Sequence, residues 1–260
     1  MRIILLFYFF FIGYIFQAQE NFSLVLKSKI NYNDSIQIAK GYDGYNFYYY
    51  NNSIIKRNLE STYRYKNIDL GEIKKIDQFN PLQTKLLYTD QNSVVILDNK
   101  LSEIKKINFN YTNPIVNIIS FASANENNIW VYDEISMRLK KYNFLKDSFD
   151  SINIPIKGEI KSLKGNYNYC WVLTNKHLYK FNYTGSLIYK IEIIDMDNFN
   201  FYKNDLIFIS NNSLFLFNES NSRLEKIIHE KLFIKDFFVI DETLYIYDED
   251  FLNQFEIKIN

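Results

Sequence analysis

The sequence predicts an all-β protein, a β-propeller of about six blades whose two chain ends join in one blade. Three observations favour this fold. Aromatic residues make up 18% of the chain, short strand-like runs alternate with polar turns, and one pattern of turn and strand recurs six times. No apolar stripe with helical spacing is sustained after Phe16. We therefore expect the core to be built from sheets.

The first eighteen residues have the pattern of a signal peptide. The positive charge of Arg2 precedes fourteen uncharged, mostly apolar residues from Ile3 to Phe16. As a helix this run would be roughly 21 Å long, shorter than the ~30 Å hydrocarbon core of a bilayer. Cleavage between Ala18 and Gln19 would leave residues 19–260 as a single propeller domain.

An uncleaved N-terminal anchor is the alternative, because the bulky Phe16 stands where signal peptidase prefers a small residue. No other stretch approaches the ~20 apolar residues of a membrane-spanning helix. We therefore expect an exported protein of the periplasm or the outer-membrane periphery, without a membrane span once the signal is removed.

The repeated unit is a polar turn followed by a short apolar strand that ends in Asn or Asp. The six closing residues are Asn58, Asp98, Asp133, Asn182, Asn218 and Asp248. Their successive intervals are 40, 35, 49, 36 and 30 residues, with a mean of 38. Propeller blades of four short strands repeat at about 40 residues. The mature chain therefore has the length of six blades.

Further strand-like runs precede most copies and supply more strands for each blade. They are Thr84 to Tyr88, Ile118 to Ala122, Asn168 to Leu173, Asp205 to Ile209 and Asp236 to Ile240. We predict that Asn21 to Leu26 completes the blade formed by the C-terminal strands, because this pairing would protect exposed strand edges. Seven blades, or an irregular β-sandwich, are the alternative folds.

Two turns and one aromatic segment have both a structural and a functional interpretation. Asp77 to Pro81 and Asn113-Pro114 are predicted to connect successive blades, with a ligand-binding loop as the alternative. Tyr45 to Tyr50 is predicted to pack between neighbouring blades. In the alternative, these aromatic side chains line a pocket for sugars or peptides.

The charge balance argues against a nucleic-acid binder. Thirty basic residues match thirty acidic ones, so the formal net charge is zero. A protein dedicated to nucleic acid usually carries a basic excess that neutralises phosphates. We expect no nucleic-acid partner.

The sequence assigns no catalytic, cofactor-binding or metal-binding residue. The single cysteine, Cys170, cannot form an internal disulfide and is predicted to be a buried, inert thiol, since no motif places His177 or His229 beside it. No nucleotide, hydrolase or zinc motif is present. The acidic residues Glu126, Asp133, Glu134, Asp195, Asp197 and Asp248 to Asp250 are predicted to lie in turns.

The chain resembles the exported, propeller-like proteins of flavobacteria and their relatives. The resemblance rests on Ala18-Gln19, Asp77 to Pro81, Ser93 to Asn99 and Asn128 to Asp133. It implies an envelope location and no particular activity. The architecture resembles, more distantly, the periplasmic propeller scaffold of outer-membrane protein assembly, although the Gly- and Trp-bearing signatures of quinoprotein-like propellers are not present.

Two functions follow as expectations. The first is a non-catalytic scaffold that binds envelope proteins through a propeller face, without a cofactor. The alternative is a carbohydrate-binding or carbohydrate-cleaving propeller. A cleaving enzyme would need two carboxylates converging with aromatic platforms in a deep central pocket.

Overall fold

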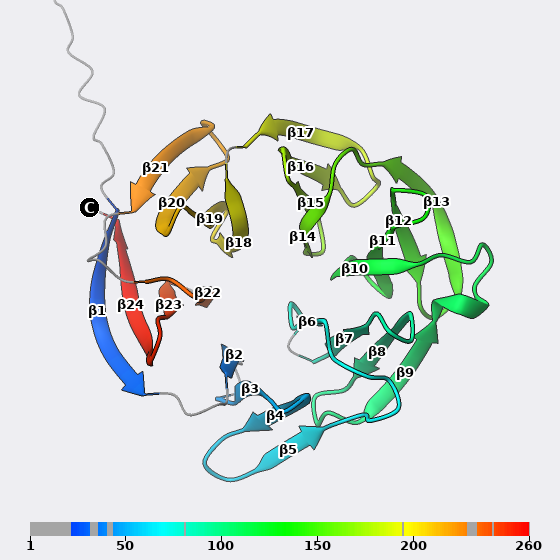
Figure 1. Ribbon diagram of the computed structural model, residues 1–260, viewed down its shortest axis with the longest axis horizontal. Coiled ribbons are helices and arrows are strands. Elements are labelled where there is room, and N and C mark those ends of the chain that lie inside the picture. Colours follow the sequence, from blue (N-terminus) through cyan, green and yellow to red (C-terminus); the bar gives the residue numbers. More distant parts are fainter. Residues whose placement is uncertain are drawn as a thin grey trace, which may run out of the picture.

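Six four-stranded antiparallel sheets surround a central axis in the computed structural model (Figure 1). The structure describes residues 22–31, 36–40, 44–80, 82–193, 195–227, 233–240 and 242–259. The prediction of a six-bladed propeller is confirmed, and seven blades and a β-sandwich are excluded. Ala18 and Gln19, the predicted cleavage residues, lie outside the described residues, as does His229.

Five blades use four consecutive strands each, which run from the axis to the rim. Blade 1 contains β2 (Ile36–Lys40), β3 (Asn46–Tyr50), β4 (Ser53–Arg57) and β5 (Thr62–Tyr65). Blade 2 contains β6 (Lys75–Asp77), β7 (Thr84–Tyr88), β8 (Ser93–Leu97) and β9 (Glu103–Asn108). Blade 3 contains β10 (Ile118–Ser123), β11 (Asn128–Asp133), β12 (Arg138–Asn143) and β13 (Ser148–Pro155). Blade 4 contains β14 (Ile160–Gly165), β15 (Tyr169–Thr174), β16 (His177–Asn182) and β17 (Leu187–Glu192). Blade 5 contains β18 (Met196–Tyr202), β19 (Asp205–Ser210), β20 (Ser213–Asn218) and β21 (Arg223–Ile227).

The sixth blade joins the two ends of the described chain, as predicted. It contains β22 (Asp236–Ile240), β23 (Thr243–Tyr247), β24 (Phe251–Ile259) and, at the rim, β1 (Phe22–Asn31). β1 pairs antiparallel with β24, from Phe22 opposite Ile259 to Asn31 opposite Phe251. The pairing covers the outer edge of β24 and closes the ring.

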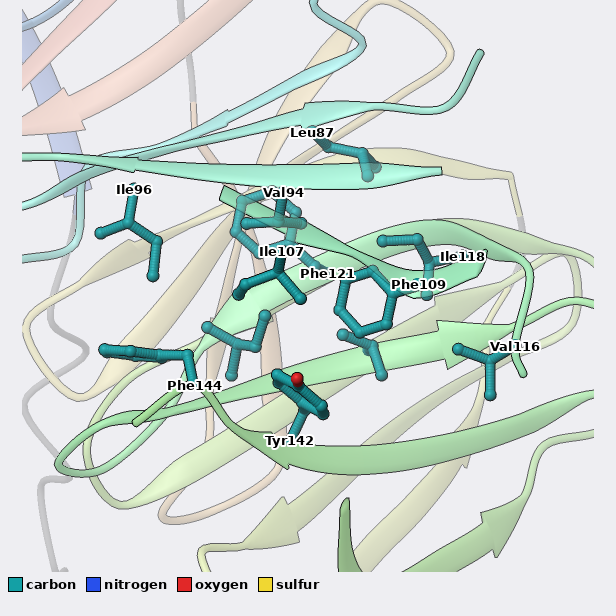
Figure 2. Packing of buried hydrophobic residues seen from close by; sticks show 12 residues of the cluster. Leu87, Val94, Ile96, Ile107, Phe109, Val116, Ile118, Phe121, Tyr142 and Phe144 are labelled. Carbon is teal, nitrogen blue, oxygen red and sulfur yellow. The ribbon is translucent and has the colours of Figure 1, made fainter. Parts of the chain in front are cut away.

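The hydrophobic core consists of clusters between neighbouring blades. Figure 2 shows the cluster between blades 2 and 3, to which Leu87 and Val94 contribute from one blade and Phe121 from the other. Successive side chains of a strand point to opposite faces of the sheet. Each blade therefore packs against two neighbours.

Asn and Asp recur along the sequence because they stabilise hairpin turns. The Oδ1 atom of Asn58 accepts hydrogen bonds from the backbone N–H groups of Glu60 and Ser61, at 2.9 and 2.8 Å. The same turn geometry follows the third strand of four further blades, at Asp98, Asn143, Asn182 and Asn218. The repeat is therefore mainly a repeat of turns.

Two of the six copies lie one strand earlier in their blades than the other four. Asp133 and Asp248 follow the second strand of blades 3 and 6, whereas the other closing residues follow the third strand. Asp248 accepts from the backbone N–H of Phe251 at 2.6 Å, so the carboxylate stabilises a hairpin here too. The count of six was correct, and the assumption of one common position was wrong.

In three blades, a second asparagine forms a hydrogen bond to the next blade. Asn52, Asn92 and Asn212 occupy the turn before the third strand, with φ values of 55°, 47° and 55°. Asn accepts this left-handed conformation more readily than most residues. Their Oδ1 atoms accept from backbone N–H groups at the start of the following blade, on Ile73, Ile118 and Ile234, at 2.8, 3.0 and 2.7 Å.

The predicted turns are confirmed in part. Asn113-Pro114 lies between β9 and β10 and joins two blades, as expected. The described part of the other turn, Asp77 to Asn80, instead joins β6 to β7 within blade 2, so its assignment as an inter-blade connection was wrong. An Asn-Pro step indicates a turn but not which strands it joins.

Two further predictions have opposite outcomes. Phe47 of the aromatic segment is buried between blades 1 and 2, as predicted for packing between blades. Asp197 and Asn198 lie in strand β18 rather than in a polar turn, so that prediction was wrong. The register of β18 against β19 shifts between Met196 and Asn198, and Asp197 pairs with Lys161 of β14.

In the described ranges, no helix combines the length and apolar character that a membrane crossing requires.

Candidate functional site

A pocket of about 680 Å³ opens between blades 4 and 5. It lies on one face of the propeller. This face carries the turns between the first and second strands of each blade and the turns between the third and fourth strands. Its aromatic lining residues are Phe79, Tyr169, Trp171 and Phe201; its amide lining residues are Asn166, Asn168, Asn204 and Asn218. Phe79 comes from the β6–β7 turn, so three blades contribute.

Aromatic rings from two facing strands form one wall of the pocket. Trp171 on β15 lies with its ring centroid 4.6 Å from that of Phe201 on β18. Tyr169, two residues before Trp171 on the same side of β15, lies 5.6 Å from the Trp171 ring in an edge-to-face arrangement. Contacts of this kind stabilise the wall beyond its buried area.

A buried ion pair joins the two blades beneath this wall. Lys180 on β16 donates to Glu219, which follows β20, and the two side chains are 11% and 10% exposed. Glu219 Oε1 also accepts from Trp171 Nε1 at 2.8 Å and from the Tyr189 hydroxyl at 2.7 Å. Burial and the neighbouring Glu219 carboxylate raise the pKa of Tyr189. Both oxygens of the carboxylate therefore accept hydrogen bonds from blade 4.

The ion pair is a variant of a contact that occurs elsewhere in the ring. Lys56 Nζ donates to the Asn99 carbonyl at 3.0 Å, and Lys141 Nζ to the Tyr183 carbonyl at 2.9 Å. In each case a lysine of a third strand reaches the following blade's turn between its third and fourth strands. Of these three acceptors, two are backbone carbonyls and one, Glu219, is a carboxylate.

The other charged side chains of the pocket also have partners. Lys203 pairs with Glu242 at 2.8 Å. Asp205 Oδ1 accepts from the backbone N–H of Glu219 at 3.1 Å. The pocket therefore offers a ligand aromatic faces and amide groups, with its charges balanced inside the protein.

Polar side chains on inner strands, together with Lys85 of β7, form a second feature, which we call the axial network. Asp77 accepts from the backbone N–H and hydroxyl of Ser123, at 2.8 and 2.7 Å, and Lys85 Nζ donates to the same hydroxyl at 3.2 Å. Lys75 Nζ donates to the carbonyl of Leu163. Lys164 Nζ donates to Asn200 Oδ1 at 2.8 Å. The remaining members are Ser120, Asn198 and Asp236.

Burial changes the acidity of this network. It lowers the pKa of Lys75 to about 8. Burial, followed by the charge of Lys75, lowers the pKa of Lys164 to about 7. Removal of water by the surrounding protein raises the pKa of Asp236, although part of its side chain still reaches solvent. The axis thus carries charges of both signs.

The residues considered from the sequence are mostly structural. Cys170 is buried, as predicted, and burial raises the pKa of its thiol. Glu126 lies in a turn, and Asp133 ends a strand, where it accepts from Lys140 Nζ at 2.8 Å. Within the described residues, no group of three or more His, Cys, Asp or Glu side chains could hold a metal ion.

Sequence reasoning missed Trp171, Lys180 and Glu219 as parts of one site. Lys180 and Glu219 are 39 residues apart, close to one repeat length. Residues about one repeat apart occupy equivalent or facing positions on neighbouring blades. The spacing of these opposite charges could therefore have indicated an ion pair between blades.

The chain is similar in structure to several propellers, at low sequence identity. Virginiamycin B lyase from Staphylococcus aureus matches with a TM-score of 0.62 and 13% identity over 85% of this chain and 80% of the lyase. BamB from Moraxella catarrhalis matches with a TM-score of 0.52 and 11% identity over 85% of this chain and 69% of BamB. A chain of the Mitotic Checkpoint Complex matches with a TM-score of 0.61 and 8% identity over 98% of both chains.

These similarities establish the fold alone, because the matched propellers differ widely in function. No protein-family model matches the sequence, and no curated protein matches it.

Proposed function

We propose that this chain is an exported, carbohydrate-binding propeller that takes a neutral saccharide in the pocket between blades 4 and 5. The observation that carries the proposal is the combination of an aromatic wall with amide side chains around a pocket of about 680 Å³. The C–H faces of a sugar ring pack well on aromatic rings, and its hydroxyl groups pair with amides. The volume lies within the range of small-molecule sites, about 300–1,000 Å³.

The charge arrangement supports a neutral ligand. Lys180 and Lys203 are each paired with a glutamate of this chain, and Asp205 accepts from the backbone. A ligand with its own charge would have to compete with these internal partners. Hydroxyl groups can instead pair with exposed amides such as Asn168 without disturbing them.

The same contacts favour binding over cleavage. A glycosidase needs one carboxylic acid that delivers a proton and one carboxylate that acts as base or nucleophile. Glu219 accepts from Lys180, Trp171 and Tyr189, so its oxygens stabilise the blade interface. We assign no catalytic step to the pocket.

Glycan-array screening followed by calorimetry tests this function. We expect a neutral oligosaccharide to bind, and Phe201→Ala to weaken its binding by roughly tenfold through loss of the aromatic wall. Asn168→Ala should weaken it by a few fold. Asn127→Ala is the matched control, because Asn127 occupies the equivalent turn of blade 3 and does not line the pocket. Absence of any bound glycan, or binding that survives Phe201→Ala in a folded variant, would overturn the proposal.

A scaffold for envelope proteins is the second candidate, and exposed apolar side chains on the opposite face favour it. Tyr111 and Ile115 precede β10 with 87% and 67% exposure, and Ile135 and Met137 lie between β11 and β12 with 75% and 61%. The two segments adjoin, since Glu134 N–H donates to the Asn117 carbonyl at 2.8 Å. Apolar side chains gathered in this way often mark protein contacts.

The double variant Ile115→Lys/Ile135→Lys separates the two functions. If the chain is a scaffold, this variant should lose envelope proteins that co-purify with the wild type, whereas Phe201→Ala should retain them. Co-purification unchanged by the lysines would exclude this face as the docking site.

A further inference from the structure

We propose that Lys164 is a reactive amine that condenses with a small 2-oxo acid to form an imine near the propeller axis. This site is separate from the saccharide pocket, and it does not depend on the function proposed above. It rests on the position of Lys164 between two inner strands, on the partner of its Nζ atom, and on the neighbouring ammonium group of Lys75.

Strand alternation directs Lys164 away from the hydrophobic core. The preceding residue, Leu163, is fully buried in the cluster between blades 3 and 4. Lys164 therefore points to the opposite face of β14, toward β18, where its Nζ lies 5.4 Å from the centroid of the Phe199 ring. Lys164 is partly exposed, in contrast to the fully buried Leu163.

The partner of Lys164 is an amide oxygen rather than a carboxylate. Nζ donates to Asn200 Oδ1 at 2.8 Å, and Asn200 Nδ2 donates to the Phe237 carbonyl at 3.0 Å. The second bond orients Asn200 with its oxygen toward Lys164. One hydrogen bond to a neutral group holds the amine in place but does not neutralise a positive charge.

A second lysine lies next to this amine. Lys75 reaches from β6 and donates to the carbonyl of Leu163, the residue directly before Lys164. Two ammonium groups repel each other, and both are partly removed from water. An amine placed beside another cation in a desolvated site is activated as a nucleophile, because more of it is neutral.

The remaining charged groups near Lys164 are few. Asp77 from β6 and Asp236 from β22 partly favour the ammonium form. The adjacent strands β10 and β15 carry no charged residue. On β18 the one charged residue, Asp197, pairs with Lys161. The balance leaves Lys164 with a pKa of about 7, so a large fraction is neutral at neutral pH.

The condensation needs no oxidant or other co-reactant. The Lys164 lone pair attacks the carbonyl carbon, and proton transfer gives a carbinolamine. The C–O bond then breaks, water leaves with the former carbonyl oxygen, and a C=N bond remains. Lys75 provides a positive charge near the carboxylate of a 2-oxo acid, which favours that class of carbonyl compound over a neutral aldehyde.

Two other lysines of blade 4 provide the contrast. Lys161 on the same strand pairs with Asp197 at 3.2 Å, and Lys180 pairs with Glu219. Both of these amines are held in ion pairs with carboxylates, whereas Lys164 Nζ donates to a neutral amide oxygen.

Reductive trapping tests the proposal with the full chain. The protein is incubated with glyoxylate and cyanoborohydride at pH 7.5, and carboxymethylated lysines are located by peptide mass spectrometry. We expect Lys164 to be labelled roughly tenfold or more faster than Lys161, with a rate that rises through a midpoint near pH 7. Labelling that follows surface exposure alone would overturn the proposal, as would a midpoint near that of a free lysine.

Three variants complete the experiment. Lys164→Arg should abolish the fast labelling, and Lys161→Arg, its control on the same strand, should leave it unchanged. Lys75→Met removes the neighbouring charge, so it should raise the midpoint of labelling and slow the reaction at pH 7.5. Fast labelling that persists in folded Lys164→Arg would exclude this residue, and an unchanged midpoint in Lys75→Met would exclude activation by Lys75.

Discussion

The two faces of blade 4 differ sharply, although the same four strands form both. The face toward blade 3 is closed. A Cβ atom placed on Gly165 would lie 2.3 Å from the backbone oxygen of Ser123, so β14 and β10 can approach only because this position has no side chain. The face toward blade 5 carries Lys164, Trp171 and Lys180, and it opens into the pocket of about 680 Å³.

Alternation along the strands produces this difference. On β15, Cys170 and Val172 join the cluster between blades 3 and 4, whereas Trp171 and Leu173 join the cluster between blades 4 and 5. On this strand the face toward blade 3 therefore carries Cys170 and Val172, and the face toward blade 5 carries the larger Trp171. One strand can therefore supply a sealed interface and a recognition surface together.

The largest effect should come from the ion pair on the open face. Glu219→Gln leaves the Lys180 ammonium buried without a counter-charge, because both side chains are only about one-tenth exposed. We expect a loss of about 3–5 kcal/mol in the free energy of unfolding, measured by denaturant titration.

The matched control for this change is Glu225→Gln. Glu225 pairs with Arg223 at 3.1 Å near the surface, and such pairs contribute about 0–1 kcal/mol. Equal losses for the two variants would contradict the importance of burial at Glu219.

A smaller effect is expected on the closed face. Gly165→Ala should lower the free energy of unfolding by roughly 1–3 kcal/mol, since the new methyl group forces β14 away from β10. Thermal unfolding measures the change. Gly44→Ala, where nothing lies within 4 Å of the added atom, reports only the cost of a positive φ. An unchanged midpoint for Gly165→Ala would mean that the two strands separate freely.

A further effect is a pH dependence of the stability through Lys164. Because its folded pKa is near 7 and its unfolded pKa is about 10.4, the unfolded chain binds more protons between these values. Charged Lys164 therefore disfavours folding below about pH 7, and this penalty is relieved as the pH rises toward 10.

Comparison with Lys164→Met isolates this contribution. The stability difference between wild type and variant should shift in favour of the wild type from pH 6.5 to 9.5, measured by urea unfolding. A difference that stays constant over this range would contradict the lowered pKa.

The sequence allowed prediction of the blades because each depends on local turn chemistry. Asn58 and Asp98 each accept from backbone groups within four residues, so their role is visible in a short stretch of chain. The position of a copy within its blade was not predictable at Asp133, since the same turn chemistry serves either hairpin.

The pocket was not predictable because its contacts connect blades. Trp171 and Glu219 are 48 residues apart, and their hydrogen bond depends on the rotation of one sheet against the next. Phe79 reaches the pocket from a turn that the Asn-Pro step identified but did not place. The alternation of residues within one strand contains no information about how one sheet is rotated against the next.

The pairing of β1 with β24 has a consequence for the order in which the molecule forms. Blades 1 to 5 use consecutive strands and can assemble while the chain is being made, whereas the first described strand must wait for the last. At about 5–20 residues per second, synthesis of the chain takes roughly 10 to 50 s. During that time the apolar residues of β1 have no sheet to join. Closure of the ring must therefore follow synthesis of β24, and until then β1 lacks the strand that it pairs with in the folded protein.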